Sequence, residues 1–145
     1  MAKKKGQAET FVLDCSVAIA WCFHDEADPY ADAIALRFPI ITAVVPAIWP
    51  LEIANAFLMG ERRKRSSQVD TSNWFSSLNS LPITVEDQNT SRVWREVMTL
   101  ARTHRLSVYD GAYLELALRR GLPLASLDEP LKAAAKAVGV PEYKP

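Results

Sequence analysis

Four acidic residues have the chemical type and the placement that a metal-dependent enzyme needs. They are Asp14, Glu52, Asp110 and Asp128, and we refer to them as the acidic set. Each lies at the start of a predicted helix or at the end of an apolar run, so one fold could gather all of them into one pocket. Carboxylates without histidine or cysteine partners suit a hard divalent cation such as Mg²⁺. A site of this kind can hydrolyse phosphodiesters by activating a metal-bound water.

Two members of the acidic set directly follow apolar runs. Asp14 follows the run 11–13, and Asp128 follows the run 122–127. In open parallel sheets, functional residues gather at the carboxyl ends of the strands, and we expect both residues there. Helix capping is the alternative for both, because Asp is favoured at N-cap positions and Asp128 stands just ahead of Pro130.

Glu52 is expected on a helix of mostly apolar residues that runs from Pro50 to about Lys64. An isolated buried carboxylate is costly, so a cation or strong hydrogen-bond donors should accompany Glu52. The alternative is that Glu52 lies on a narrow exposed stripe of the helix. Asn55 lies one helical step further along the same face, and it could orient Glu52 or a metal-bound water.

Asp110 has two competing interpretations. Ser107 stands three residues before it, which matches the capping-box pattern in which Asp110 would reach back to the backbone of Ser107. Asp110 also shares a helical face with Leu114 and Ala117, which would turn it toward the interior. A capping carboxylate and a carboxylate in a functional pocket are both compatible with this spacing.

Short apolar runs alternate with helical patterns along the chain. The predicted strands are residues 11–13, 44–45, 83–85 and 122–127, with a further short strand starting at Val140. The predicted helices are residues 16–23, 29–38, 50–64, 71–81, 89–104, 107–121 and 130–138. This alternation predicts an α/β fold in which helices cover both faces of a parallel sheet.

Local signals add detail to these elements. Ser16 is expected to cap the first helix, and Thr71 or Ser72 the fourth. In the helix 89–104, apolar residues that include Trp94 and Val97 recur at helical spacing and predict a buried stripe.

The composition is that of one globular domain. A chain of 145 residues with 49% hydrophobic content can bury a real core. The formal net charge of zero argues against a nonspecific DNA coat but leaves room for a local basic patch. Cys15 and Cys22 would lie about 10 Å apart along one helix, which is too far for a disulfide. Free thiols of this kind fit a reducing, cytoplasmic location.

The N-terminus and the most apolar stretch bear on targeting. Residues 1–9 are polar and include three lysines, so we expect a flexible basic tail ahead of a single domain at 10–145. No apolar core of a signal peptide follows the lysines directly. The stretch 38–60 is interrupted by prolines, Glu52 and Asn55, so it predicts a buried strand and helix and not a membrane span.

A basic run follows the helix that carries Glu52, and it consists of Arg62, Arg63, Lys64 and Arg65. These residues would complement the helix dipole and solvate a loop, or they would contact nucleic-acid phosphates beside the acidic site. Arg119 and Arg120 have the same two interpretations. The four tryptophans are expected in the core or at an interface, and not as base-stacking platforms.

Segments of the chain resemble PIN domains, and more closely the VapC-type ribonuclease toxins of toxin–antitoxin systems. The matching segments are FVLDCSVAIAW (11–21), PAIWPLEIANAF (46–57), LSVYDGAYLELALRRGLPLASLD (106–128) and EPLKAAAKAVGV (129–140). The resemblance implies a PIN-like three-layer α/β/α sandwich with a central parallel sheet. Gly111 stands where the family commonly has Ala, which would mildly loosen its helix.

The resemblance also implies an activity and partners. It implies a Mg²⁺- or Mn²⁺-dependent endoribonuclease in which the acidic set holds one or two ions. Ser16 and Ser126 stand at the small hydroxyl positions of the family, and with Asn55 they would support the ligands. VapC-type toxins further imply a cognate antitoxin as partner, a transfer or ribosomal RNA as substrate, and a homodimer.

Two other classes of function compete with this interpretation. Enzymes that form a phosphoaspartate also use an Asp after the first strand, but the haloacid-dehalogenase-like phosphatases need a second Asp where this chain has Ser16. Receiver domains need an acidic pair near the first strand and a late lysine, and Asp14 lacks the pair. The third class is a noncatalytic protein-interaction module, which metal-dependent cleavage of RNA would distinguish from a nuclease.

Overall fold

The structure is a computed structural model, and it describes residues 9–145. Its strands are β1 (Thr10–Leu13), β2 (Thr42–Val45), β3 (Ile83–Val85) and β4 (Leu124–Ala125). Its α-helices are α1 (Cys15–Cys22), α2 (Pro29–Ala35), α3 (Trp49–Arg62), α4 (Gln68–Asn79), α5 (Thr90–Arg92), α6 (Met98–His104), α7 (Val108–Arg120) and α8 (Glu129–Ala137). A 3₁₀ turn, η1 (His24–Glu26), follows α1, and a π-helical segment, η2 (Val93–Val97), joins α5 to α6.

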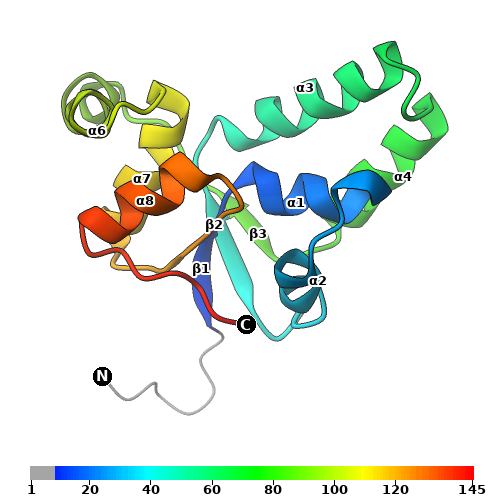
Figure 1. Ribbon diagram of the computed structural model, residues 1–145, viewed down its shortest axis with the longest axis horizontal. Helices are drawn as coiled ribbons and strands as arrows, with labels where there is room; N and C mark the ends of the chain where they lie inside the picture. Colours follow the sequence, from blue (N-terminus) through cyan, green and yellow to red (C-terminus); the bar gives the residue numbers. More distant parts are fainter. Residues whose placement is uncertain (1–8) are drawn as a thin grey trace.

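The strands form one parallel sheet in the order β3-β2-β1-β4 (Figure 1). Val12 of β1 stands opposite Val44 of β2 and Leu124 of β4. A parallel bridge between Leu124 and Glu142 extends the β4 edge, close to where the sequence predicts a last short strand. Because all strands run the same way, their carboxyl ends meet at one edge of the sheet.

Helices cover both faces of this sheet. Figure 1 shows α1 to α4 on one side and α6, α7 and α8 on the other. On the first side α1 contacts α2 and α3, and on the second side α7 contacts β1, β4, α6 and α8. The α/β/α arrangement with a central parallel sheet confirms the predicted fold class.

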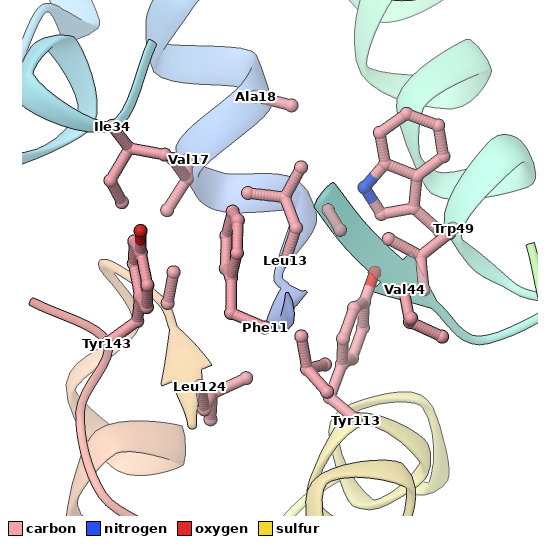
Figure 2. Packing of buried hydrophobic residues seen from close by; sticks show 14 of the residues in the cluster. Phe11, Leu13, Val17, Ala18, Ile34, Val44, Trp49, Tyr113, Leu124 and Tyr143 are labelled. Carbon is pink, nitrogen blue, oxygen red and sulfur yellow. The ribbon is translucent and has the colours of Figure 1, made fainter. Parts of the chain in front are cut away.

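The core is built around β1, which is buried on both faces. Phe11, Val12 and Leu13 have no exposed surface. The ring of Phe11 stacks on that of Tyr143 with 4.2 Å between centroids (Figure 2). Because β1 runs through the middle of the molecule, the residue that follows it, Asp14, ends inside the protein with 3% of its surface exposed.

Two predicted helix caps are wrong. The first helix begins at Cys15, so Ser16 lies inside it and Asp14 takes the N-cap position. The fourth helix begins earlier than predicted because Ser67 and Asp70 form a complete capping box, with bonds of 3.1 and 2.9 Å between each side chain and the other residue's backbone N–H. These reciprocal bonds satisfy two backbone N–H groups at the helix start that have no partner within the helix. A cap at Thr71 or Ser72 would leave both of them unpaired.

Two helices are more exposed than their sequences predict. Trp94 was expected in the buried stripe of its helix, but it lies within η2 and is 74% exposed. The wider π-helical turn interrupts the period of 3.6 residues on which that prediction depends. In α3, Leu51 and Leu58 are exposed, so the helix that carries Glu52 is only partly buried.

The remaining expectations concern the ends of the chain and its thiols. The predicted basic tail comprises residues 1–9. Residues 1–8 lie outside the described part, and Glu9 is held by contacts with Arg37 and Tyr143. Cys15 and Cys22 are both free, as predicted. Within residues 9–145, no helix combines the length and the apolar character that crossing a bilayer requires.

Candidate functional site

Asp14 is the centre of a small hydrogen-bond network between the ends of β1 and β4. Its Oδ2 accepts hydrogen bonds from the hydroxyls of Ser16 at 2.6 Å and Ser126 at 2.8 Å. The backbone N–H of Asp14 donates to the carbonyl of Ala125 at 2.9 Å, which ties the two strand ends together. The carboxylate is therefore buried, but its position is fixed by hydroxyl donors.

The two serines also organise the chain that follows β4. Ser16 Oγ accepts from the N–H of Leu127 at 3.0 Å, and Ser126 Oγ accepts from the N–H of Asp128 at 3.0 Å. Each hydroxyl thus donates to Asp14 and accepts from the β4–α8 connection. This explains why small hydroxyl residues occupy both positions, and it links Asp14 to Asp128 through one intervening side chain.

Asp128 is the N-cap of α8, as the capping alternative predicted. Its Oδ2 accepts from the N–H of Leu131 at 3.0 Å. The side chain is partly exposed, and its charge raises the pKa of both Asp14 and Asp110. Capping therefore does not remove Asp128 from the site.

Glu52 enters the site from the first turn of α3. Its Oε1 accepts a 2.7 Å hydrogen bond from the hydroxyl of Tyr113, whose side chain has no exposed surface. In Figure 2 the ring of Tyr113 rises from α7 past the sheet. Asn55, which was expected to orient Glu52, is exposed and makes no hydrogen bond with Glu52 in the described structure, so Tyr113 has that position instead.

Asp110 lies in the first turn of α7, partly buried. Ser107 is the N-cap, and its Oγ accepts from the N–H of Asp110 at 3.0 Å. The reciprocal bond, in which the backbone N–H of Ser107 would donate to the Asp110 carboxylate, is not formed in the described structure, whereas Ser67 and Asp70 form theirs. The carboxylate of Asp110 is therefore not committed to capping the backbone.

The charges of the acidic set act on one another. Burial raises the pKa of Asp14, and the charge of Asp128 adds to this shift. The hydrogen bonds from Ser16 and Ser126 act in the opposite direction and lower the pKa. Burial also raises the pKa of Asp110, with additions from Asp128 and Asp14. The pKa of Glu52 is raised by burial first, with the Tyr113 bond opposing and the charges of Asp14 and Asp110 adding. Asp14 and Asp110 thus link Glu52 and Asp128 electrostatically into one set.

The acidic set has the donor chemistry for a divalent cation. Within residues 9–145, no lysine, arginine or histidine forms an ion pair with any member. The mutual repulsion is therefore not offset by a protein cation, and a hard metal ion would offset it.

The side chains are not yet arranged around a metal. As they stand, no group of three or more acidic, histidine or cysteine side chains in the described residues could hold an ion. One oxygen each of Asp14, Glu52 and Asp128 accepts a bond from a protein donor. Each carboxylate has two oxygens and keeps further acceptor sites, so binding a metal would require the carboxylates to draw closer together and not to give up these bonds.

Tyr113 and Cys15 are residues of this site that the sequence reasoning missed. Tyr113 stands three residues after Asp110 on the same helical face, and that spacing could have identified it. Cys15 adjoins Asp14, and burial and the charges of Asp14 and Glu52 raise the pKa of its thiol. Cys15 is therefore a neutral thiol that lines the site and not a thiolate nucleophile.

The basic run lies at the opposite end of α3 from Glu52. The helical rise per residue puts the start of the run about 15 Å from Glu52. Arg65 forms ion pairs with Asp25 at 2.9 Å and Glu26 at 3.5 Å, and it lies 4.4 Å above the ring of Phe23. Arg65 therefore stabilises the fold, while the other members of the run are exposed.

Arg119 is also committed to the fold. It pairs with Glu86 at 2.6 Å and with Glu115 at 2.8 Å, and Glu115 is nearly buried. Arg92 reaches the same Glu115 at 3.4 Å. These ion pairs join α5, α7 and the residue after β3.

Comparison with known proteins identifies relatives of this fold. The family model of the PIN domain matches residues 11–137. A crystal structure of PAE2754 from Pyrobaculum aerophilum is similar with a TM-score of 0.66 and 23% identity, covering 88% of this chain and 87% of that chain. A crystal structure of FitAcB from Neisseria gonorrhoeae is similar with a TM-score of 0.52 and 17% identity, covering 92% of this chain and 96% of that chain. No curated protein matches the sequence.

Proposed function

The chain belongs to the PIN-domain family, and from that premise we propose that it is an endoribonuclease that hydrolyses RNA phosphodiesters with Mg²⁺ or Mn²⁺. PIN domains are generally nucleases, so the proposal concerns the metal and the RNA substrate. The observation that carries it is the acidic set itself. The four carboxylates come from four different helix starts, and none has an ion-pair partner among residues 9–145. Burial raises the pKa of Asp14, Glu52 and Asp110, and charges within the acidic set add to each shift.

The residues divide the work of the site between them. Asp14, Glu52 and Asp110 would hold the ion or ions, with Asp128 binding a second ion or a metal-bound water. A divalent ion, when bound, lowers the pKa of a coordinated water and offsets the charge of the scissile phosphate. The hydroxyls of Ser16 and Ser126 fix the rotamer of Asp14, while Tyr113 fixes that of Glu52. Outer partners of this kind orient metal ligands and tune their affinity.

We also propose that the chain is the toxin of a toxin–antitoxin pair that acts in the cytoplasm on transfer or ribosomal RNA. The support is the resemblance of four segments to VapC-type toxins. A nuclease of that kind needs a protein inhibitor, so the partner would be a small antitoxin encoded beside this chain. We further propose a homodimer.

An apolar groove is a candidate surface for such a protein partner. It has a volume of about 520 Å³ and lies among α3, α4 and β3, where Trp49, Phe75 and Val85 line it. The indole N–H of Trp49 is buried without a hydrogen-bond partner in the described residues. Phe75, Val85 and the neighbouring Leu51 are substantially exposed, so apolar area is available for contact.

The experiment that tests the activity uses the purified chain and a labelled single-stranded RNA. We expect cleavage with Mg²⁺ or Mn²⁺ and none after chelation. The partner is tested separately by co-expression with the neighbouring gene product, which should co-purify and suppress cleavage. A chain that expresses freely alone, arrests no growth and binds no neighbour would count against the toxin proposal but not against the nuclease.

A further inference from the structure

We propose that the outer face of residues 90–105, the arginine-rich segment, is where unpaired RNA docks on this protein. In this arrangement Trp94 stacks on a base, and Arg95, Arg102 and Arg105 contact phosphates. The inference rests on the proposed ribonuclease function and adds to it the surface that receives the substrate.

The exposure of Trp94 is the first observation. Its side chain is 74% exposed, whereas Trp49 is buried at 7%. An exposed indole on a well-formed helix contributes little to folding, since most of its apolar surface remains in water. Aromatic faces of this kind bind unpaired bases with little dependence on sequence, because every base has a π-face.

The segment carries a local excess of positive charge. Its charged residues are four arginines and one acidic residue, Glu96, within a chain whose formal net charge is zero. Arg92 is paired with Glu115. The side chains of Arg95, Arg102 and Arg105 are exposed and make no ion pair or hydrogen bond in residues 9–145. These three guanidinium groups are therefore available to phosphates.

The spacing aligns these groups. The hydroxyl of Thr99 donates to the Arg95 carbonyl at 2.9 Å, which places Arg95 one turn before Thr99. Arg102 follows Thr99 by three residues in α6, so all three project from one side of the helix. Trp94 and Arg95 sit within the π-helical segment η2, where the change of period brings the indole outside. Single π-helical turns of this kind occur frequently at functional sites.

The segment is joined directly to the acidic site. Its last residue, Arg105, is the left-handed C-cap of α6 and stands five residues before Asp110. Val97 and Ala101 pack against Gly111, where an added Cβ would lie 3.2 Å from the Val97 carbonyl oxygen. Tyr109, between the segment and Asp110, is 58% exposed. An RNA strand on this segment would therefore lie beside α7, the helix that carries Tyr109 and Asp110.

A second copy of the chain is the main alternative occupant. Symmetric pairing of this face would bring the same arginines of both copies together, which costs energy unless acidic groups intervene. Glu96 is the single acidic residue in the segment. Charge complementarity therefore favours a polyanion, and stacking on Trp94 favours one with unpaired bases.

The test measures binding of a fluorescein-labelled single-stranded RNA by anisotropy, in EDTA, over a range of salt concentrations. One variant carries Arg95→Gln, Arg102→Gln and Arg105→Gln, and a second carries Trp94→Ala. The matched control carries Arg62→Gln, Arg63→Gln and Lys64→Gln, which removes the same charge from the basic run at the far end of α3. Circular dichroism and thermal melting check that each variant is folded.

We expect the triple arginine variant to reduce the slope of log binding constant against log salt concentration by about 2, because each lost phosphate contact removes about 0.7. Trp94→Ala should weaken binding by about 5- to 150-fold, which corresponds to 1–3 kcal/mol per stacked base, without changing the slope. The control should keep the wild-type slope.

Three results would overturn the inference. They are a wild-type slope in the triple arginine variant, an equal or larger slope change in the control, and a wild-type dimer that these substitutions turn into a monomer. Failure of the proposed function is a separate result, because it would appear as a wild-type protein that binds RNA but does not cleave it with Mg²⁺.

Discussion

The hydroxyl of Tyr113 donates a 2.7 Å hydrogen bond to Oε1 of Glu52 and so connects α7 to α3 at the candidate site. The two residues are 61 positions apart, and the phenol has no exposed surface. Burial raises the pKa of Tyr113, and the charges of Asp14 and Glu52 and the hydrogen bond to Glu52 add to the shift, so the hydroxyl keeps its proton and remains a donor. Tyr113 is therefore placed to hold Glu52 in one orientation.

Removing this hydroxyl should weaken metal binding without unfolding the protein. Tyr113→Phe keeps the buried ring but leaves one Glu52 oxygen without its donor. Loss of a partner that orients a metal ligand typically costs about 10- to 100-fold in metal affinity or activity. Isothermal titration with Mn²⁺ measures the affinity directly, and Tyr109→Phe, in the same helix but exposed, is the matched control. Equal Mn²⁺ affinity in wild type and Tyr113→Phe would show that the bond has only a structural role.

Asp110→Asn should abolish metal-dependent cleavage and leave thermal stability nearly unchanged. The reason is that the carboxylate of Asp110 does not complete a capping box with Ser107, and its pKa is raised by burial and by Asp128 and Asp14. Differential scanning calorimetry and the cleavage assay should be run on the same preparation. Retained cleavage together with a lowered Tm would mean that Asp110 is a capping residue after all.

The pH dependence of stability should reveal the repulsion within the acidic set. Burial raises the pKa of Asp14, Glu52 and Asp110, so the native state holds these protons more tightly than the unfolded chain does. Their contribution to stability is present below the unfolded pKa values, and it is lost as the pH rises through the raised folded values. Glu86 acts in the opposite direction, because its hydrogen bond to Arg119 lowers its pKa.

A comparison with Asp14→Asn cancels the contribution of Glu86. The variant lacks one titrating member of the set. The difference between its Tm and that of wild type should therefore move in favour of the variant as the pH rises from 4 to 8. Mg²⁺ should shrink this gain at the upper end, because it stabilises wild type by binding the native state. A Tm difference that is independent of pH and of Mg²⁺ would be incompatible with a strained acidic cluster at Asp14.

Gly111→Ala should fail to stabilise α7, although Ala is the better helix former by about 1 kcal/mol. A Cβ at this position would lie 3.2 Å from the Val97 carbonyl oxygen and 3.3 Å from a Val97 methyl carbon. The carbonyl belongs to the backbone of η2 and cannot yield as a side-chain end would. Urea denaturation should therefore give an unfolding free energy equal to or below that of wild type. A gain near the full helix-propensity difference would show that the α6–α7 contact is loose.

The fold could be predicted from the sequence because its strands and helices have strong local signals. The run 11–13 is apolar throughout, as expected for a strand buried on both faces, and Gly121 ends α7 in the left-handed conformation that favours glycine. The cap at Ser16 was wrong because its hydroxyl bonds Asp14 and the N–H of Leu127, and the caps at Thr71 or Ser72 were wrong because Ser67 and Asp70 form a complete capping box. Trp94 was misplaced because a π-helical segment has no signal in the spacing of apolar residues.

The candidate site was only partly accessible to sequence reasoning. The acidic set stands out as charge at the ends of apolar runs, and the structure brings its members within electrostatic reach. The hydrogen bond of Tyr113 to Glu52 depends on how α7 packs against α3, which no local pattern encodes. Arg65 was grouped with its basic neighbours, but its ion pairs with Asp25 and Glu26 come from a turn 40 residues earlier.

The most direct test of the central claim is RNA cleavage by wild type and Asp14→Asn across a Mg²⁺ titration. Asp14→Asn removes one ligand charge and almost no volume, and its amide oxygen can still accept from the hydroxyls of Ser16 and Ser126. We predict a folded variant whose cleavage at saturating Mg²⁺ falls to the level seen in EDTA, while wild type gains activity with each addition of metal. Unchanged turnover of Asp14→Asn at saturating Mg²⁺, or wild-type cleavage that persists in EDTA, would contradict a metal-dependent ribonuclease built on the acidic set.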